Sequence, residues 1–236
     1  MQLSPTIEVT DQIVDVSGLT KAQLNYYVSL ARDLAAKYEK KEQGRQIFTL
    51  NGPAGAGKSV VATILELIFK EEDSRFQFMN VGLDGFHLSN EVLKEKGLMD
   101  VKGRHDTYDN DLLFEKLSEF KKGESIVFPV YSRQDHNPVA DRLPTSNQNI
   151  LLLIEGQWLL RNKPEWTRVS DLSTHNYEIS ATTEQMKEGV IDRHVRGGKT
   201  EAEATKFYTD SDLKNTEEIQ KNSIKADEQV KFYKDI

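Results

Sequence analysis

Cysteine is absent from the sequence, and its absence excludes several kinds of site at once. Without thiols the chain can form no disulfide, no thiolate zinc site and no cysteine nucleophile. No apolar run approaches the roughly 18 residues that a membrane-spanning helix needs, so we expect no membrane segment. Met1–Gly18 also lack the basic start and apolar stretch of a secretory signal, which favours a cytoplasmic protein.

Positive charge is scarce relative to negative charge. The 236 residues include 31 Lys and Arg against 38 Asp and Glu, so the net charge is −7. A protein that binds nucleic acid needs a large basic surface to neutralise phosphates, and we therefore expect no nucleic-acid partner. Hydrophobic residues at 37% and charged residues at 29% are typical of a globular protein with one domain, or one domain and an appendage.

The N-terminal part is predicted to form a helical extension. Two short extended pieces are expected around Ile7–Val9 and Ile13–Val16, followed by a helix over Lys21–Lys41. Thr20 can cap this helix, and Gln23 completes a capping box three residues on. Apolar residues recur along the helix at helical spacing, which predicts one buried stripe and a packing role.

After Gly44 the sequence alternates between strand-like and helical segments. Strands are predicted over Gln46–Asn51, Phe76–Leu83, part of Ile126–Tyr131, Ile150–Ile154 and Asn176–Ser180, with a late edge strand within Ser223–Tyr233. Helices are predicted over Ser59–Glu71, Asp111–Lys122, Thr183–Arg196 and Thr200–Thr209. The alternation predicts an α/β fold in which helices flank a parallel sheet. Ligands should gather at the carboxyl ends of its strands.

Residues 52–59 read Gly-Pro-Ala-Gly-Ala-Gly-Lys-Ser and match the full phosphate-loop pattern G-x-x-x-x-G-K-[ST]. A predicted strand precedes the loop and a predicted helix follows it, so its N–H groups can surround an anion. Lys58 is expected to reach the β- and γ-phosphates, and the Ser59 hydroxyl to bind magnesium. The alternative is a glycine-rich turn with an incidental lysine. The predicted nucleotide-binding residues are Gly52, Pro53, Ala54, Gly55, Ala56, Gly57, Lys58, Ser59 and Val60.

Two acidic residues follow predicted strands. Asp84 comes after Phe76–Leu83 and could accept a proton from a substrate hydroxyl or position magnesium. Glu155 ends the apolar run Ile150–Ile154 and is expected to hold magnesium, because a metal offsets the cost of burying a carboxylate. The alternatives are a loop aspartate that caps the next turn and a solvated glutamate at a strand end.

Three further polar segments could supply binding groups. Pro129–His136 is predicted as an irregular segment between two elements, where binding groups tend to lie, and Lys102–Asp109 is similar in kind. The arginines before Gly197–Lys199 fit a lid that closes over a triphosphate. Ordinary polar loops and a solvated helix face are the alternatives. The candidate residues are His87, Arg104, Tyr108, Tyr131, Arg133, His136, Arg193 and Arg196.

The ordered set of motifs resembles the uridine kinase, phosphoribulokinase and type I pantothenate kinase group of P-loop kinases. After the phosphate loop come DGFH at 84–87, PVYSR at 129–133, IEG at 154–156 and an arginine-containing lid. The combination looks most like a bacterial nucleoside-kinase-like, fructose-transport-associated subgroup. The resemblance implies a three-layer P-loop NTPase fold, with a kinase domain over 45–236, a lid at about 190–212 and an N-terminal extension over 1–44.

The resemblance also implies a reaction, in which the γ-phosphoryl group of ATP passes to a hydroxyl of a nucleoside, sugar or pantothenate-like metabolite. Asp84 would be the general base, with Lys58, Arg193 and Arg196 assisting, and Ser59 and Glu155 would hold Mg²⁺. A homodimer is compatible with this interpretation. The acceptor pocket would be lined by Asp84, His87, Arg104, Tyr108, Tyr131, Arg133 and His136.

Two departures from the uridine kinase pattern argue against a pyrimidine nucleoside acceptor. His87 stands where those enzymes have the tyrosine of an Asp-x-Phe-Tyr motif. Ser132-Arg133 follow Tyr131 where those enzymes have an aspartate after the aromatic residue. The acceptor is therefore left open by the sequence.

Two other functional classes remain as alternatives. Asp100–Gly103 and Asn162–Glu165 echo the DxxG and NKxD motifs of a GTPase-like switch, although Glu165 replaces the aspartate that would pair with guanine. A non-catalytic nucleotide-binding regulator is the other alternative, but Lys58 and Asp84 are both present and nothing indicates lost chemistry.

Overall fold

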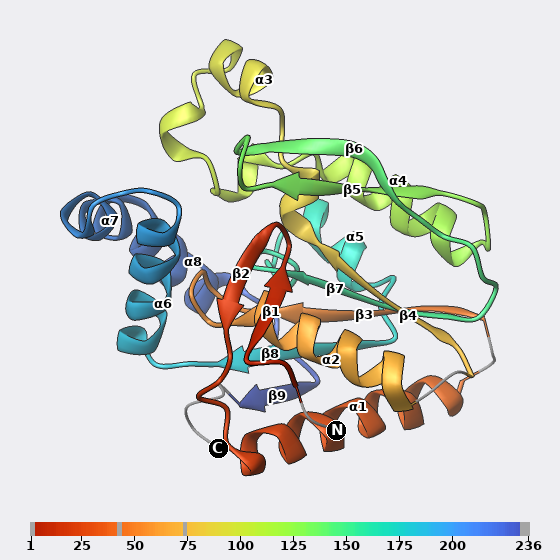
Figure 1. The fold of residues 1–236 in the computed structure, drawn as a ribbon. Coiled ribbons are helices and arrows are strands. Elements are labelled where there is room, and N and C mark those ends of the chain that lie inside the picture. Colours follow the sequence, from red (N-terminus) through yellow and green to blue (C-terminus); the bar gives the residue numbers. More distant parts are fainter. Residues whose placement is uncertain (1–2, 42–43, 73–74, 232–236) are drawn as a thin grey trace.

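The computed structural model of the chain describes all residues except 1–2, 42–43, 73–74 and 232–236. Its centre is a five-stranded parallel sheet with the strand order β4-β7-β3-β8-β9 (Figure 1). The strands are β3 Arg45–Asn51, β4 Gln77–Gly82, β7 Ile150–Gly156, β8 His175–Ser180 and β9 Glu228–Lys231. Hydrophobic cores lie on both faces of this sheet, so the predicted three-layer α/β fold is confirmed.

The side chains of β7 explain why helices cover both faces of the sheet. Those helices are α1 Lys21–Glu39, α2 Lys58–Glu72, α4 Asn110–Lys121 and α5 Pro164–Ser170. Leu151 and Leu153 pack into the core that contains α1 and α2, whereas Ile150, Leu152 and Ile154 pack into the core that contains α4 and α5. Successive side chains of a strand point to opposite faces, so five consecutive apolar residues require cover on both sides.

The N-terminal part begins with an antiparallel hairpin, β1 Thr6–Val9 and β2 Gln12–Asp15. It leads into α1, where the predicted capping box is present: the Thr20 hydroxyl accepts from the Gln23 N–H, and the Gln23 side chain accepts from the Thr20 N–H. α1 packs beside α2 in one of the two cores of the sheet. The domain division at residue 44 stays a prediction.

One predicted strand lies outside the parallel sheet. The prediction that Ile126–Tyr131 joins that sheet is wrong, because the segment forms β5 Val127–Ser132 and pairs antiparallel with β6 Asn137–Pro144. Only residues 133–136 separate these strands, a connection that suits a hairpin, whereas a parallel neighbour needs a crossover of a dozen or more residues. The description of Pro129–His136 as irregular is therefore wrong for its first four residues.

The predicted lid spans the end of α6, then α7 and a π-helical turn, η4. The C-terminal helical elements are α6 Thr183–Arg196, α7 Glu201–Phe207, η4 Tyr208–Asp212 and α8 Leu213–Asn222. The predicted helix over Thr183–Arg196 is confirmed, and the one over Thr200–Thr209 is confirmed with a shorter α-helical part. The late edge strand is β9, while residues 232–233 of its predicted range lie outside the described residues.

Short elements connect β4 to α4 above the carboxyl edge of the sheet. They are η1 Leu83–Phe86, α3 Asn90–Glu95, η2 Met99–Val101 and η3 His105–Thr107. Together with the β5–β6 hairpin they build the wall that faces the phosphate loop. None of the helices in the described part of the chain is long and apolar enough to span a membrane.

Candidate active site

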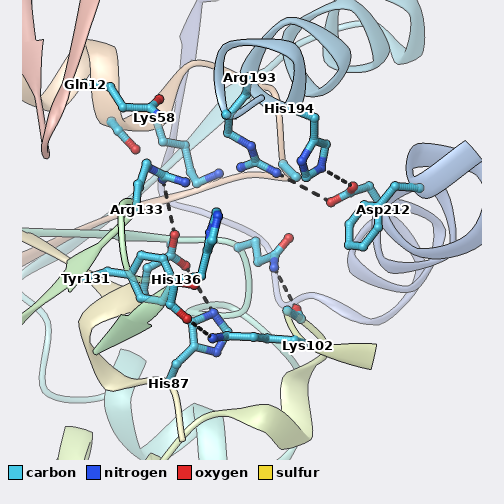
Figure 2. Close-up of a pocket in the computed structure, with 18 of the residues that line it drawn as sticks. Gln12, Lys58, His87, Lys102, Tyr131, Arg133, His136, Arg193, His194 and Asp212 are labelled. Atoms are coloured by element: carbon cyan, nitrogen blue, oxygen red, sulfur yellow. Dashed lines mark hydrogen bonds and ion pairs between the residues drawn. The ribbon is translucent and has the colours of Figure 1, made fainter. Parts of the chain in front are cut away.

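A cavity of about 320 Å³ opens where β3, β4 and β7 end. Its walls come from the phosphate loop, η1, the segment around η2, the β5–β6 hairpin and α6 (Figure 2). This is the edge at which a parallel sheet binds ligands. The cavity brings together the predicted site residues Ala54, Lys58, Ser59, Asp84, His87, Tyr108, Tyr131, Arg133, His136, Glu155 and Arg193.

The phosphate loop has the backbone that its glycines permit. Gly55 and Gly57 have φ angles of 78° and 81°, in the left-handed region that glycine adopts without strain. The buried Lys58 ammonium donates a 2.8 Å hydrogen bond to the Pro53 carbonyl across the loop. Burial lowers the pKa of Lys58, while the charges of Glu155 and Asp84 oppose that effect. A phosphate anion at this loop would satisfy a buried cation that now binds only a neutral carbonyl.

Ser59 and Glu155 form a pair of oxygen donors beside the loop. The Ser59 hydroxyl donates a 2.6 Å hydrogen bond to Glu155, which sits at the end of β7. Burial raises the pKa of Glu155, and Lys58 partly offsets this rise. The described residues contain no cluster of three or more His, Cys, Asp or Glu side chains that could hold a metal. The hydroxyl and carboxylate oxygens of the pair fit Mg²⁺, which binds proteins through few oxygen ligands and completes its shell with phosphate and water.

Asp84 lies on η1, directly after β4, and its side chain is 40% exposed to the cavity. One carboxylate oxygen is 3.4 Å from Nη2 of Arg133, and the other is 3.4 Å from the Tyr108 hydroxyl. Burial raises the pKa of Asp84, but its basic neighbours hold that pKa below its ordinary value: the His87 ring where it is protonated, and the positive charges of Arg133, Arg193 and Lys58. Asp84 is therefore an ionised carboxylate that can accept a proton at neutral pH.

The ring of His87 is fixed between two neighbours behind Asp84. It stacks on Tyr108 with ring centroids 3.9 Å apart, and its Nδ1 lies 3.2 Å from the Thr107 carbonyl, to which it must donate. Its Nε2 then faces Asp84 at 3.7 Å. Burial lowers the pKa of His87, so the ring is neutral at pH 7, and its position is set by Tyr108 and the Thr107 carbonyl.

Among the predicted catalytic and acceptor residues, two do not line the cavity; of the predicted nucleotide-binding residues, Gly52, Pro53, Gly55, Ala56, Gly57 and Val60 do not line it either. Arg104 pairs with Asp106 at 2.6 Å, and Arg196 pairs with Asp192 at 3.1 Å, so both guanidinium groups are engaged elsewhere. Their predicted roles would require a movement of these segments. Arg193 differs, because it reaches the cavity from the last turn of α6 (Figure 2).

A buried carboxylate on η4 faces the end of α6. Asp212 lies 3.8 Å from Nη2 of Arg193 and 3.5 Å from Nε2 of His194. These contacts connect η4 to the helix that carries Arg193, and the side chain of Asp212 is almost fully buried. Neither Asp212 nor His194 was predicted as a site residue, although His194 stands between the two predicted lid arginines.

Three more cavity residues were missed by sequence reasoning. Gln157 follows the IEG motif directly, and its amide donates to the Gly103 carbonyl at 2.8 Å. Lys102 neighbours the predicted Arg104 and points into the cavity where that residue does not. Gln12 comes from β2, and no motif in its surroundings could have connected it to a phosphate loop 40 residues later.

α6 packs against the phosphate loop backbone to backbone. A Cβ atom on Gly189 would lie 2.5 Å from the Gly55 carbonyl oxygen, and one on Gly55 would lie 2.0 Å from the Met186 carbonyl oxygen. Backbone atoms cannot yield as a flexible side chain can. The contact therefore fixes the helix that carries Arg193 relative to the loop.

Gly189→Ala should push α6 away from the phosphate loop. We expect the melting temperature to fall by about 2–12 °C, because overpacking costs about 1–3 kcal/mol and 1 kcal/mol shifts the melting temperature of a domain of this size by about 2–4 °C. Differential scanning calorimetry without Mg-ATP measures the melting temperature of the variant. The rise in melting temperature that Mg-ATP causes should be smaller in the variant than in the unchanged protein. Gly18→Ala is the control, since no atom lies within 4 Å of its Cβ position. Equal behaviour of the two variants would contradict this packing account.

The β1–β2 hairpin closes one side of the cavity. At its tip, the Asp11 carboxylate accepts hydrogen bonds from the backbone N–H groups of Arg133 at 2.6 Å and Gln134 at 3.1 Å. Gln12, the next residue, lines the same cavity as Lys58 (Figure 2). A second cavity of about 600 Å³ lies between this N-terminal segment, α2 and β5, and it shares Asp84 with the first. The N-terminal extension is thus part of the wall around Asp84.

Asp11→Ala should undock the hairpin from the β5–β6 turn that carries Arg133. We expect KM for the acceptor to rise about 3- to 10-fold, the loss of one or two ordinary hydrogen bonds, with KM for ATP unchanged. Steady-state kinetics with an acceptor that the protein phosphorylates measures both constants. Glu8→Ala on the same hairpin, where the side chain is exposed, should leave both constants unchanged. A rise in KM for ATP alone would show that the hairpin supports ATP binding rather than acceptor binding, and it would contradict this prediction.

The two echoes of GTPase motifs do not assemble at the cavity. Gly103 lines it, but Asp100 is exposed on η2. Asn162–Glu165 leads into α5, where Glu165 pairs with Arg161 at 3.2 Å. None of the four residues 162–165 is among those that line the cavity.

Comparison with known proteins identifies relatives of the whole arrangement. The sequence model of the phosphoribulokinase / uridine kinase family matches residues 47–202. The chain is 31% identical to the uncharacterized protein YggC of Escherichia coli K12 over 202 residues, covering 86% of this chain and 84% of YggC. It is 28% identical to a pantothenate kinase of Levilactobacillus brevis over 237 residues, covering 89% of this chain and 76% of that enzyme.

A solved structure supports the fold. The protein from Silicibacter sp. TM1040 described as a candidate fructose transport system kinase superposes with a TM-score of 0.79. The match covers 86% of this chain and 98% of that one, at 22% sequence identity. At this identity the likeness concerns the fold alone.

Proposed function

The chain belongs to the phosphoribulokinase / uridine kinase family of P-loop small-molecule kinases, and on this premise we propose its reaction. The protein transfers the γ-phosphoryl group of ATP to a hydroxyl group of a nucleoside, sugar or pantothenate-like metabolite. One observation carries the proposal: the ionised carboxylate of Asp84 faces the same cavity as the phosphate-loop ammonium of Lys58. A small-molecule kinase needs such a base for the proton of the acceptor hydroxyl.

The phosphate loop and its neighbours are the proposed site for Mg-ATP. The loop N–H groups and Lys58 would hold the β- and γ-phosphates, and Ser59 and Glu155 would hold Mg²⁺. When bound, magnesium neutralises charge on the transferred group. Arg193 reaches the cavity from α6 and would add positive charge where the transition state develops negative charge.

The residues opposite the loop are the proposed acceptor side. Asp84 takes the proton of the acceptor hydroxyl, and the hydroxyl oxygen bonds to the γ-phosphorus. At the same time the bond from that phosphorus to the β,γ-bridging oxygen breaks. The products are a phosphate ester and ADP, and Asp84 leaves the step protonated. Arg133 and Tyr108 hold the carboxylate oxygens and so direct the base toward the cavity.

A coupled ADP-release assay over pools of nucleosides, sugars, sugar phosphates and hydroxy acids tests this proposal. We expect ADP release that depends on one acceptor pool and on magnesium. Thermal-shift measurements should show stabilisation by ATP with magnesium. Stabilisation by GTP alone, or hydrolysis that no pool accelerates, would contradict the kinase proposal and favour a nucleotide switch.

A further inference from the structure

We propose that the phosphoryl acceptor is an anion, a hydroxy acid or sugar phosphate whose charged oxygens bind Lys102. This inference rests on the proposed kinase function and deepens it. The starting point is an excess of positive charge at the cavity of a protein whose net charge is −7. The ionisable cations that line the cavity are Lys58, Lys102, Arg133, Arg193 and Lys199, and the carboxylates are Asp84, Glu155 and Asp212.

Each of the three carboxylates already has partners. Glu155 accepts from Ser59, and Asp212 faces Arg193 and His194 on the lid side of the cavity. The partners of Asp84 are Arg133, Tyr108 and His87, as described above. Among the described residues, Lys102 and Lys199 have no carboxylate within 4.0 Å, so the cavity holds cations that the protein itself leaves unbalanced.

Mg-ATP does not account for Lys102. Lys58 and Arg193 approach from the phosphate loop and from α6, where the triphosphate belongs, whereas Lys102 approaches with His87 and Tyr131 from the opposite wall (Figure 2). The charge of Lys102 lowers the pKa of His87 and that of His136, and both histidines are on that wall as well. An acceptor whose hydroxyl meets Asp84 would extend along this wall.

Lys102 is held ready for an anion. Its half-buried ammonium donates to Asn90 Oδ1 at 2.7 Å and to the His136 carbonyl at 2.5 Å, and it lies 5.2 Å from the ring centroid of Tyr131. An ammonium has three N–H donors, so these two neutral acceptors leave one donor over. Burial lowers the pKa of Lys102, and the charge of Asp84 offsets this effect only in part.

The same wall carries further positive charge. Burial and the charges of Lys199, Lys102 and Arg133 lower the pKa of His136, so these cations converge around one ring. His136 has a φ of 48° in the turn between β5 and β6, and it lines the cavity. A neutral nucleoside or sugar would leave these charges partly desolvated and unpaired, which is costly, whereas a carboxylate or phosphate would pair with them.

Acceptors matched in their hydroxyl groups but not in charge test the inference. Glycerate and glycerol, pantothenate and panthenol, and ribose 5-phosphate and ribose form three pairs, within wider pools of anionic and neutral hydroxyl compounds. We expect ADP release with the anionic pool at a kcat/KM at least about tenfold above that of the neutral pool. Comparison of the two carboxylate pairs with the phosphate pair shows whether the site prefers a carboxylate or a phosphate. Preference for the neutral pool would overturn the inference but leave the kinase function, and no release with either pool would overturn the kinase function itself.

Substitution of Lys102 assigns the preference to this side chain. With the preferred anion, Lys102→Met should raise KM about 10- to 100-fold, the effect of losing one charged hydrogen bond, while KM for ATP stays unchanged. Lys102→Arg should restore most of the affinity, which a purely structural role of the lysine would not explain. The control is Lys96→Met, an exposed position on the same connection. Unchanged charge preference in Lys102→Met, or a rise only in KM for ATP, would overturn the assignment.

Discussion

Asp84→Asn should lower kcat by at least about a hundredfold and leave ATP binding intact, because a general base contributes about 10²–10⁴ to such a rate. The amide has the shape of the carboxylate but cannot take the hydroxyl proton. Its oxygen can still accept from Arg133 at the position that the carboxylate now occupies, so the wall of the cavity should persist. Acceptor-dependent ADP release measures kcat, and titration calorimetry with Mg-ATP measures binding.

Asp106→Asn is the matched control for this variant. Asp106 pairs with Arg104 on an exposed surface and does not line the cavity, so its amide should retain full activity. If Asp84→Asn were as active as Asp106→Asn, Asp84 would have no part in proton transfer.

Lys58→Met should lower kcat/KM for ATP by about 10²–10³, the loss expected when one preorganised donor is removed from a transition state. Methionine fills the space of the aliphatic chain but offers no cation to the phosphates. Burial lowers the pKa of Lys58, so its charge is destabilising in the empty protein and its removal should not reduce the melting temperature. Kinetics and calorimetry together separate lost catalysis from lost folding.

Lys70→Met on the same helix is the control, because Lys70 is 66% exposed and pairs with Glu66 at 3.0 Å. It should leave kcat/KM for ATP unchanged. Unchanged kinetics in Lys58→Met as well would discredit the phosphate loop as the ATP site.

The centre of the fold could be predicted because its signals are local. The run Ile150–Ile154 is buried on both faces because no polar residue interrupts it. The phosphate loop is specified by eight consecutive residues, and Asp84 and Glu155 are brought to the same cavity by the parallel pairing of β4 with β7. A motif that follows a strand in a parallel sheet needs no long-range information to be placed at the carboxyl edge.

The rest of the site depends on pairings between distant segments. β5 reads as another strand of the sheet, and only its partner β6 decides that it forms a hairpin above the sheet instead. Gln12 reaches the cavity because Asp11 docks on the turn at Arg133, 122 positions later in the chain. A strand pattern specifies which faces are buried but not which strand is its neighbour.

The choice among neighbouring basic residues also could not be made from the sequence. Lys102 and Arg104 are two positions apart, yet Lys102 lines the cavity while Arg104 pairs with Asp106. Arg193 and Arg196 diverge in the same way, because three residues of helix turn them to different contacts, Asp212 and Asp192. Side-chain direction within a short turn or a last helical turn depends on which anion is nearest, and motif spacing does not contain that information.

The fate of the γ-phosphoryl group tests the central claim most directly. Incubation with γ-³²P-ATP, magnesium and the anionic acceptor pool, followed by separation of organic phosphate esters from inorganic phosphate, follows the group itself. The account predicts that label passes to an organic ester, that the transfer requires the acceptor, and that Asp84→Asn abolishes most of it. Label that enters only inorganic phosphate, at the same rate with and without an acceptor, would contradict it.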